Sequence, residues 1–200
     1  MLITSAIVNN LLEDYTRLLL QANEEMNLIS RKNSEAVAKL LIEESLAPCN
    51  LPGFNLQAPI LDIGSGGGIP GIPLAIFDTN KAVHLLEPRR LRVLFLNDTV
   101  QELKLSRVKV LAGKAEELCT HPDCRYAYGT VVSRAVTTFA DLLKWGSVLL
   151  KPGGELILWK GSQSINEKYK LDRSVWSEPE IYPLESGVSV VRFVLRSRRK

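Results

Sequence analysis

Residues 60–71 read Ile60-Leu61-Asp62-Ile63-Gly64-Ser65-Gly66-Gly67-Gly68-Ile69-Pro70-Gly71, and this stretch decides the fold. A short apolar run ends in a carboxylate and a cluster of glycines, as a strand does where it leads into a nucleotide-binding turn. Glycines accept positive φ angles and let backbone N–H groups approach a ligand that a Cβ atom would push away. We therefore expect a binding loop here for a cofactor that contains adenosine.

An acidic residue at the end of a second apolar run supports this interpretation. Glu87 lies twenty-three positions beyond Gly64 and closes the run Ala82-Val83-His84-Leu85-Leu86. A carboxylate at that place can accept hydrogen bonds from both hydroxyl groups of a ribose. We predict a cofactor cradle that is formed by Asp62, Gly64, Gly66 and Glu87.

The spacing of the glycines separates three cofactor classes that use a strand, a glycine loop and a helix. A phosphate-binding P-loop needs a lysine after its second glycine, but Ile72 follows Gly71. A dinucleotide-binding loop has the motif G-x-G-x-x-G, and counted from Gly64 the last glycine of that motif is replaced by Ile69. NAD is therefore disfavoured but stays open as an alternative. The cofactor that fits best is S-adenosyl-L-methionine, whose ribose carries no phosphate.

Length and composition are those of a compact protein. The chain has 200 residues, of which 46% are hydrophobic, enough to bury a substantial core. No run approaches the roughly 18 apolar residues of a membrane span, and residues 1–5 do not resemble a secretion signal. We expect one cytoplasmic domain over residues 1–200, with a helical extension over 1–58 and a cofactor-binding sheet core over 59–200. The three cysteines form no C-x-x-C pair, so we expect reduced thiols and no metal site.

Apolar runs that alternate with helical patterns predict a parallel sheet. Helical spacing indicates two helices before residue 50, a helix that starts near Pro70 and Pro73, and further helices over 89–103 and around Leu142. The expected strands lie near 60–63, 82–86, 108–111, 128–132 and 155–159, with a turn at 151–154 and an edge hairpin over 181–195. The predicted fold is a three-layer, doubly wound, mostly parallel α/β sheet whose ligand crevice lies at the carboxyl ends of the central strands.

Basic residues are unevenly distributed, although the net charge is only +3. One group opens the helix near residue 90, and another lies at the C-terminus. Such patches neutralise the phosphates of a nucleic acid, or are simply solvated. The two groups are Arg89, Arg90 and Arg92, and Arg192, Arg196, Arg198, Arg199 and Lys200.

The chain resembles class I S-adenosylmethionine methyltransferases. More closely, it resembles the glucose-inhibited division protein B family, which are guanine-N7 methyltransferases of small-subunit ribosomal RNA. The resemblance covers most of the chain and rests on the long glycine block with its two prolines and on several shorter motifs. These motifs are Asn27-Leu28-Ile29-Ser30, residues 61–75, residues 87–96, Ala115-Glu116-Glu117, Ser133-Arg134-Ala135 and Lys160-Gly161.

The resemblance implies a cytoplasmic enzyme that moves a methyl group from S-adenosylmethionine to N7 of a guanine in 16S ribosomal RNA or the small ribosomal subunit. We expect the enzyme to be a monomer. It places Gly64 and Ile69 along the methionine and adenosine side of the cofactor, Glu87 at the ribose, and Ala115-Glu116 at the adenine. Arg134 is the expected catalytic residue and orients the guanine or the carboxylate of the cofactor. An ion pair of Arg134 with Asp62 or Glu87 is the alternative.

Two positions depart from the family pattern. Leu41 stands where many relatives have a histidine, and Leu91-Arg92 stands where a basic pair is common, with Arg89 and Arg90 upstream. Ser133-Arg134 replaces the Asn- or Asp-Pro-Pro-aromatic motif of amino-group methyltransferases, so an exocyclic nitrogen is a poorer target.

Neutral guanine N7 already has a lone pair, so we expect positioning to carry catalysis without a general base. Lys160 is a weaker candidate for a contact with RNA phosphate. A methyltransferase with another substrate and a non-catalytic RNA-binding scaffold of the same fold stay open as alternatives.

Overall fold

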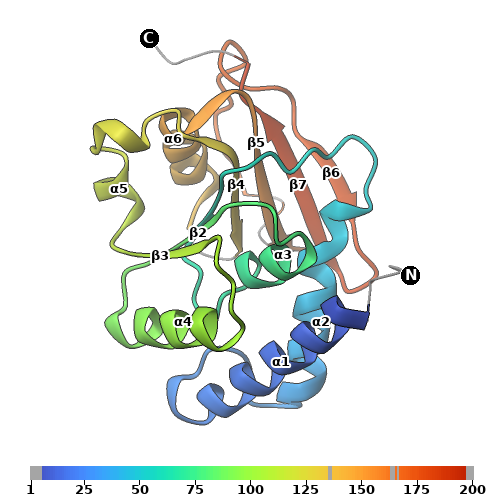
Figure 1. Cartoon of the computed structure of the whole chain (residues 1–200). Coiled ribbons are helices and arrows are strands. Elements are labelled where there is room, and N and C mark those ends of the chain that lie inside the picture. The colour runs from blue at the N-terminus through green and yellow to red at the C-terminus, as the bar shows by residue number, and fades with distance from the viewer. Residues whose placement is uncertain (1–5, 135–136, 163–164, 166, 197–200) are drawn as a thin grey trace.

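The computed structural model of the chain describes residues 6–134, 137–162, 165 and 167–196. Helices and strands alternate through most of this range (Figure 1). The helices are α1 (Ala6–Met26), α2 (Ser34–Leu46), α3 (Gly71–Phe77), α4 (Arg90–Glu102), α5 (Ala115–Leu118) and α6 (Phe139–Leu149), with short 3₁₀ turns at Ala47–Cys49 and Pro122–Cys124. The strands are β1 (Ile60–Ile63), β2 (Val83–Glu87), β3 (Val108–Ala112), β4 (Tyr128–Arg134), β5 (Leu150–Gly161), β6 (Glu180–Pro183) and β7 (Val188–Val194).

The strands form one seven-stranded sheet in the order β3-β2-β1-β4-β5-β7-β6. Strands β1 to β5 pair in parallel, whereas β7 pairs antiparallel with both β5 and β6. The chain moves outward from β1 to β3 and then returns to place β4 on the other side of β1. Because the connections diverge there, the loops after β1 and β4 leave a crevice at their carboxyl ends.

Successive side chains of the central strands face two separate hydrophobic layers. In β1, Ile60 packs with the layer that contains α1 to α4, and Leu61 packs with the layer that contains α6. The same alternation places Val132 of β4 in the first layer and Val131 in the second. Helices therefore cover both faces of the sheet, and the three-layer, doubly wound, mostly parallel fold expected from the sequence is confirmed.

The two N-terminal helices pack on the core beside the glycine loop that follows β1. Helix α1 lies against α2, α3 and α4, and α2 also packs on α3 (Figure 1). Tyr15 and Leu19 of α1 are fully buried, as is Ala38 of α2. The extension thus forms part of the wall around the carboxyl ends of the strands. No helix in the described part of the chain is long and apolar enough to span a membrane.

Most expected elements occur where the sequence indicates them, but the turn at 151–154 is wrong. These residues belong to β5, which begins at Leu150 directly after α6. Gly153 donates a backbone hydrogen bond to Leu195 and Gly154 accepts one from it, at 2.7 and 2.9 Å. Residues 151–154 form a bulge within β5, since Gly153 has a φ of 81° and the pairing with β4 shifts between Leu150 and Glu155. Pairing with Leu195 keeps the bulge in the strand, and periodicity along the chain does not reveal such a partner.

Candidate functional site

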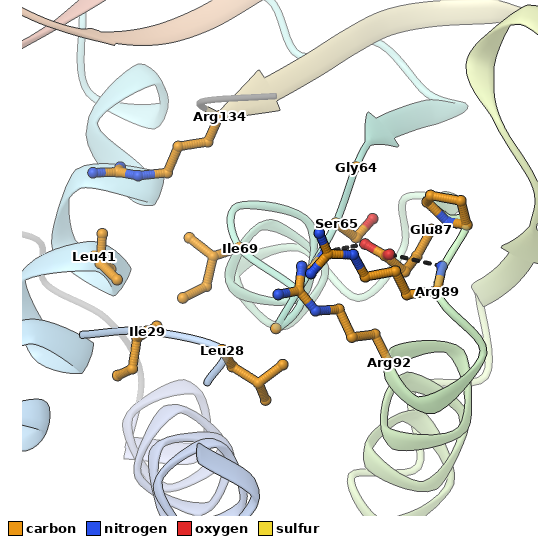
Figure 2. A pocket seen from close by; sticks show the side chains of 13 residues that line it. Leu28, Ile29, Leu41, Gly64, Ser65, Ile69, Glu87, Arg89, Arg92 and Arg134 are labelled. Carbon is orange, nitrogen blue, oxygen red and sulfur yellow. Dashed lines mark hydrogen bonds between the residues drawn. The ribbon is translucent and has the colours of Figure 1, made fainter. Parts of the chain in front are cut away.

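A cavity of about 430 Å³ lies at the carboxyl ends of the central strands (Figure 2). This volume falls within the range of about 300–1,000 Å³ that is typical of small-molecule sites. Its walls come from the loop after β1, the end of β2, the start of α4, the end of β4, and the segment and helix that follow α1. The lining residues are Leu28, Ile29, Leu41, Gly64, Ser65, Gly66, Gly67, Ile69, Glu87, Pro88, Arg89, Arg92 and Arg134.

The glycine loop is fixed by backbone hydrogen bonds to the neighbouring strand. The N–H groups of Gly64 and Ser65 both donate to the carbonyl of Leu86, at 2.8 and 3.1 Å. Gly64 and Gly66 have φ angles of 74° and 58°, which disfavour residues with a side chain. The loop is therefore preorganised, and it presents backbone to the cavity where a Cβ would narrow the space.

Glu87 ends β2 with its carboxylate turned toward the glycine loop. One oxygen accepts a hydrogen bond from the Gly66 N–H and the other from the Arg89 N–H, both at 2.9 Å. The residue is only 3% exposed, yet it lines the cavity. Because each carboxylate oxygen has a second lone pair, the group can accept from ribose hydroxyls while it holds the loop.

Asp62 does not line the cavity, although the sequence places it in the cofactor cradle. Its side chain is fully buried, and one oxygen accepts a 3.0 Å hydrogen bond from the Gly71 N–H at the start of α3. The other oxygen has no hydrogen-bond partner among the described residues. Burial raises the pKa of Asp62 to about 7. The carboxyl group therefore holds the point where the glycine loop passes into α3.

Helix α1 also contacts the glycine loop, and the sequence did not indicate this contact. The hydroxyl of Tyr15 donates a 2.8 Å hydrogen bond to the carbonyl of Gly67. A Cβ placed on Gly67 would lie 2.8 Å from Cδ1 of Leu19, so α1 approaches the loop as closely as glycine allows. The helical periodicity of α1 predicted a buried face but could not show which loop that face meets.

Arg134 ends β4 and lines the cavity, as expected, but its ion-pair partner is neither Asp62 nor Glu87. The guanidinium pairs through Nη2 with the carboxylate of Glu44 in α2. The Arg134 side chain runs from β4 toward α2, on the side of the cavity that is remote from Glu87 (Figure 2). Its other terminal nitrogen, Nη1, is buried and has no hydrogen-bond partner among the described residues. This nitrogen is a donor that a bound ligand can satisfy.

Ala115 and Glu116, which the resemblance places at the adenine, do not line the cavity in this structure. They form the first turn of α5, where Ala115 is buried and Glu116 is exposed. The adjacent Gly113 donates a 3.2 Å backbone hydrogen bond to Glu87, which connects this turn to the edge of the site.

Of the three arginines at the start of α4, two line the cavity and one faces solvent. Arg89 and Arg92 line the cavity on the side of Glu87, and both side chains reach toward the glycine loop (Figure 2). Arg90 is exposed and does not line the cavity. The exposed Leu91 separates it from Arg92, so two arginines face the ligand site and a third faces outward.

The surroundings of Lys160 do not favour the predicted contact with RNA phosphate. Its ammonium donates a 2.9 Å hydrogen bond to the Thr137 carbonyl and lies 4.5 Å from the centre of the Phe139 ring. The residue is 4% exposed, and burial lowers the pKa of its amine.

The C-terminal basic group is only partly within the described chain. The Arg192 guanidinium is held by Glu155 and Glu180 at 2.5 and 2.8 Å. Arg196 is exposed. Arg198, Arg199 and Lys200 lie outside the described residues, so the predicted contact of this tail with RNA stays a prediction.

These features fit S-adenosylmethionine. Glu87 offers acceptors for a ribose, the glycine loop leaves room at the backbone, and Arg134 offers an unpaired donor for a carboxylate. Leu28, Ile29 and Ile69 supply an apolar wall, and Leu41 adds to it where many relatives are expected to have histidine. Among the described residues, no three His, Cys, Asp or Glu side chains gather as a metal site.

Comparisons with known proteins show which family and which fold the chain is similar to. The solved glycopeptide N-methyltransferase MtfA, complexed with S-adenosylmethionine, is similar in fold, with a TM-score of 0.59 and 16% identity over 78% of this chain and 94% of that chain. The ribosomal RNA small subunit methyltransferase G of Alkaliphilus oremlandii is 32% identical over 86% of this chain and 72% of that protein. The Wolinella succinogenes protein of the same name is 40% identical over 78% of this chain and 77% of that protein.

A family model described as rRNA small subunit methyltransferase G matches residues 8–183. The match includes both N-terminal helices and continues to the end of β6, so it spans every element that lines the cavity. The resemblance seen in the sequence is thereby confirmed, and the chain belongs to the rRNA small subunit methyltransferase G family.

Proposed function

We propose that this chain transfers the methyl group of S-adenosylmethionine to N7 of a guanine in 16S ribosomal RNA. The observation that carries the proposal is the Glu87 carboxylate, which lines the cavity and accepts a hydrogen bond from the Gly66 N–H of the glycine loop. The names of the relatives support ribosomal RNA of the small subunit as the substrate. We further propose that residues 1–200 act as one cytoplasmic unit and as a monomer.

The chain's residues act by binding and positioning. When bound, S-adenosylmethionine supplies a methyl group on a positively charged sulfur, which is open to attack by a nucleophile. Glu87 holds the ribose, and the backbone of Gly64 and Gly66 lets the rest of the cofactor approach closely. Ile69 and Leu41 exclude water from one side of the cavity, which favours a transfer that needs no water.

The lining side chains match an attack by guanine N7. This nitrogen carries its lone pair in the neutral base, so no proton has to be removed before the methyl group is transferred. The ionisable side chains that line the cavity are Glu87, Arg89, Arg92 and Arg134, and Glu87 is already bonded to two backbone N–H groups. The site therefore depends on holding the nucleophile and the methyl group in line, which is the contribution of proximity and orientation.

Arg134 is the residue that we assign to orientation. Its Nη1 can donate to O6 of the target guanine or to the carboxylate of the cofactor, since both are hydrogen-bond acceptors. Arg89, Arg90 and Arg92 supply positive charge around the mouth of the cavity, where an RNA backbone has to pass.

Chemical mapping of ribosomal RNA tests the proposal directly. RNA from cells that contain or lack the gene is cleaved at N7-methylguanine and analysed by mass spectrometry. We expect one modified guanine in 16S RNA that disappears without the gene and returns when the gene is restored. Identical maps would contradict the proposal. Binding of S-adenosylmethionine by the purified protein with identical maps would indicate a methyltransferase for another substrate, and binding without any turnover would indicate a scaffold.

A further inference from the structure

Glu44 is a buried acid whose carboxylate meets the site only through another residue. It lies in the last turn of α2 and is 4% exposed. Its carboxylate pairs with Nη2 of Arg134, and it is absent from the lining of the cavity. The residues around Glu44 do not indicate this role, since an acid near the end of an apolar helix is commonly solvated.

The backbone of Glu44 is fixed as firmly as its side chain. Its carbonyl accepts a 2.7 Å hydrogen bond from the indole N–H of Trp159, a fully buried residue of β5. Trp159 pairs with Arg134 across the parallel strands β4 and β5. One residue of α2 is thus attached to the ends of two adjacent strands, so its carboxylate has little freedom to move relative to Arg134.

The two terminal nitrogens of the Arg134 guanidinium have different surroundings. Nη2 is held by Glu44, whereas Nη1 is buried without a partner in the described part of the chain. A buried donor without an acceptor is unfavourable, and the cavity that Arg134 lines is where an acceptor can enter. A guanidinium is planar and rigid, so fixing one terminal nitrogen also fixes the direction of the other.

We propose that Glu44 is a positioning residue of the active site, which holds Arg134 so that Nη1 donates to an oxygen of the bound cofactor or guanine. This inference rests on the proposed function and names one residue that the function depends on. Glu44 acts only through Arg134. Its removal should therefore impair the reaction when Arg134 is present and change little when Arg134 has been replaced.

A double-mutant cycle tests this dependence. Glu44→Gln keeps the shape of the side chain but removes its charge, and Arg134→Ala removes the guanidinium. Glu43→Gln is the matched control, because Glu43 is the exposed neighbour on the same helix. Each protein is assayed for kcat and KM with S-adenosylmethionine and with small ribosomal subunits that lack the modification, and for affinity to S-adenosylhomocysteine by calorimetry. Thermal unfolding verifies that each variant is folded at the assay temperature.

We expect Glu44→Gln to lower kcat/KM by about tenfold to a hundredfold, as small displacements of a positioning group do. Glu43→Gln should stay within about twofold of the wild type, the scatter expected of a surface change. In the Arg134→Ala background, Glu44→Gln should add less than about twofold, because interacting residues are not additive. An increased KM for the cofactor would place the acceptor on S-adenosylmethionine, and a decreased kcat with cofactor affinity retained would place it on the guanine.

The inference is overturned if Glu44→Gln leaves kcat and KM unchanged, or if its effect is the same with and without Arg134. If Glu44→Gln does not fold, Glu44→Asp takes its place in the same cycle, because it keeps the charge and retracts it by one methylene. Failure of the proposed function looks different: the wild-type protein itself then binds no S-adenosylhomocysteine or methylates no subunit.

Discussion

The hydroxyl of Tyr15 in α1 donates a 2.8 Å hydrogen bond to the carbonyl of Gly67, fifty-two positions further along the chain. Tyr15 is fully buried, and burial together with the nearby Asp62 raises its pKa well above the ordinary value. The hydroxyl therefore stays protonated and remains a donor at physiological pH. One hydrogen bond thus ties the helical extension to the loop that is expected to receive the cofactor.

Replacing Tyr15 with Phe should lower both stability and cofactor affinity. The change leaves the buried Gly67 carbonyl without its partner, which costs about 1–3 kcal/mol of unfolding free energy. Urea denaturation measures the loss, and calorimetry with S-adenosylhomocysteine measures the affinity. Tyr182→Phe is the control, because its hydroxyl bonds to Glu180 on the edge hairpin, far from the loop. Equal cofactor affinity of Tyr15→Phe and the wild type would show that the loop keeps its shape without this bond.

Replacing Glu87 with Gln should weaken cofactor binding while the protein stays folded. A charge-assisted hydrogen bond contributes about 1.5–3 kcal/mol, so the dissociation constant should rise by roughly tenfold to 150-fold. Calorimetric titration with S-adenosylmethionine gives the constant directly. Glu102→Gln serves for comparison, since the exposed Glu102 side chain at the end of α4 does not line the cavity. An unchanged constant for Glu87→Gln would remove Glu87 from the ribose site.

The buried Asp62 should make stability depend on pH. Its pKa is about 7 in the folded protein and near 3.8 when unperturbed, so the unfolded chain loses this proton first as the pH rises. The contribution of Asp62 to the free energy of unfolding is most favourable below about pH 4, and it is lost as the pH rises through about 7. Asp62→Asn imitates the protonated acid, so its stability relative to the wild type should increase between pH 5 and pH 8 by on the order of a few kcal/mol.

Denaturant midpoints at several pH values measure this difference. Asp98→Asn makes the same charge change on the exposed side of α4 and is the control. Parallel profiles for Asp62→Asn and the wild type would mean that Asp62 ionises as readily in the folded protein as in the unfolded chain.

The arginines of α4 should separate RNA binding from cofactor binding. Arg90→Gln should reduce the slope of log affinity for ribosomal RNA against log salt concentration by about 0.7, the value for one phosphate contact on a single strand. It should leave affinity for S-adenosylhomocysteine unchanged, since Arg90 does not line the cavity. Arg92→Gln should alter both quantities, because Arg92 does line it. Identical salt slopes for Arg90→Gln and the wild type would remove Arg90 from the RNA surface.

The C-terminal tail requires its own measurement. Replacing Arg198, Arg199 and Lys200 together should reduce the salt slope by about 2 if all three contact phosphates. Filter binding of ribosomal RNA over a series of salt concentrations provides the slope. A slope equal to that of the wild type would show that the tail does not contact RNA phosphate.

The sequence predicts local features of this fold well. The glycine block, the acid at the end of β2 and the alternation of apolar runs with helical patterns depend on neighbours in the chain, so they can be read from it. For the same reason the positions of Gly64, Gly66 and Glu87 in the site could be foreseen. Their geometry follows from one strand, one turn and the strand beside it.

Contacts between distant segments could not be foreseen in this way. Nothing near Arg134 in the sequence indicates that Glu44, ninety positions earlier, is its partner. Lys160 looks like a solvated strand-end cation, but the packing of Phe139 and Thr137 decides its surroundings. Asp62 bonds to the Gly71 N–H rather than lining the cavity, and its position before the glycines does not show this contact.

The attachment of α1 and α2 to the glycine loop and to Arg134 has a consequence for protein engineering. A terminal extension that makes no contact with the active site can be exchanged for that of another protein in order to change the target of an enzyme. Here a chimera that imported foreign helices would also discard the loop's anchor and the arginine's counter-ion. Any transplant that is to remain active has to carry a tyrosine and a carboxylate equivalent to Tyr15 and Glu44 across the junction.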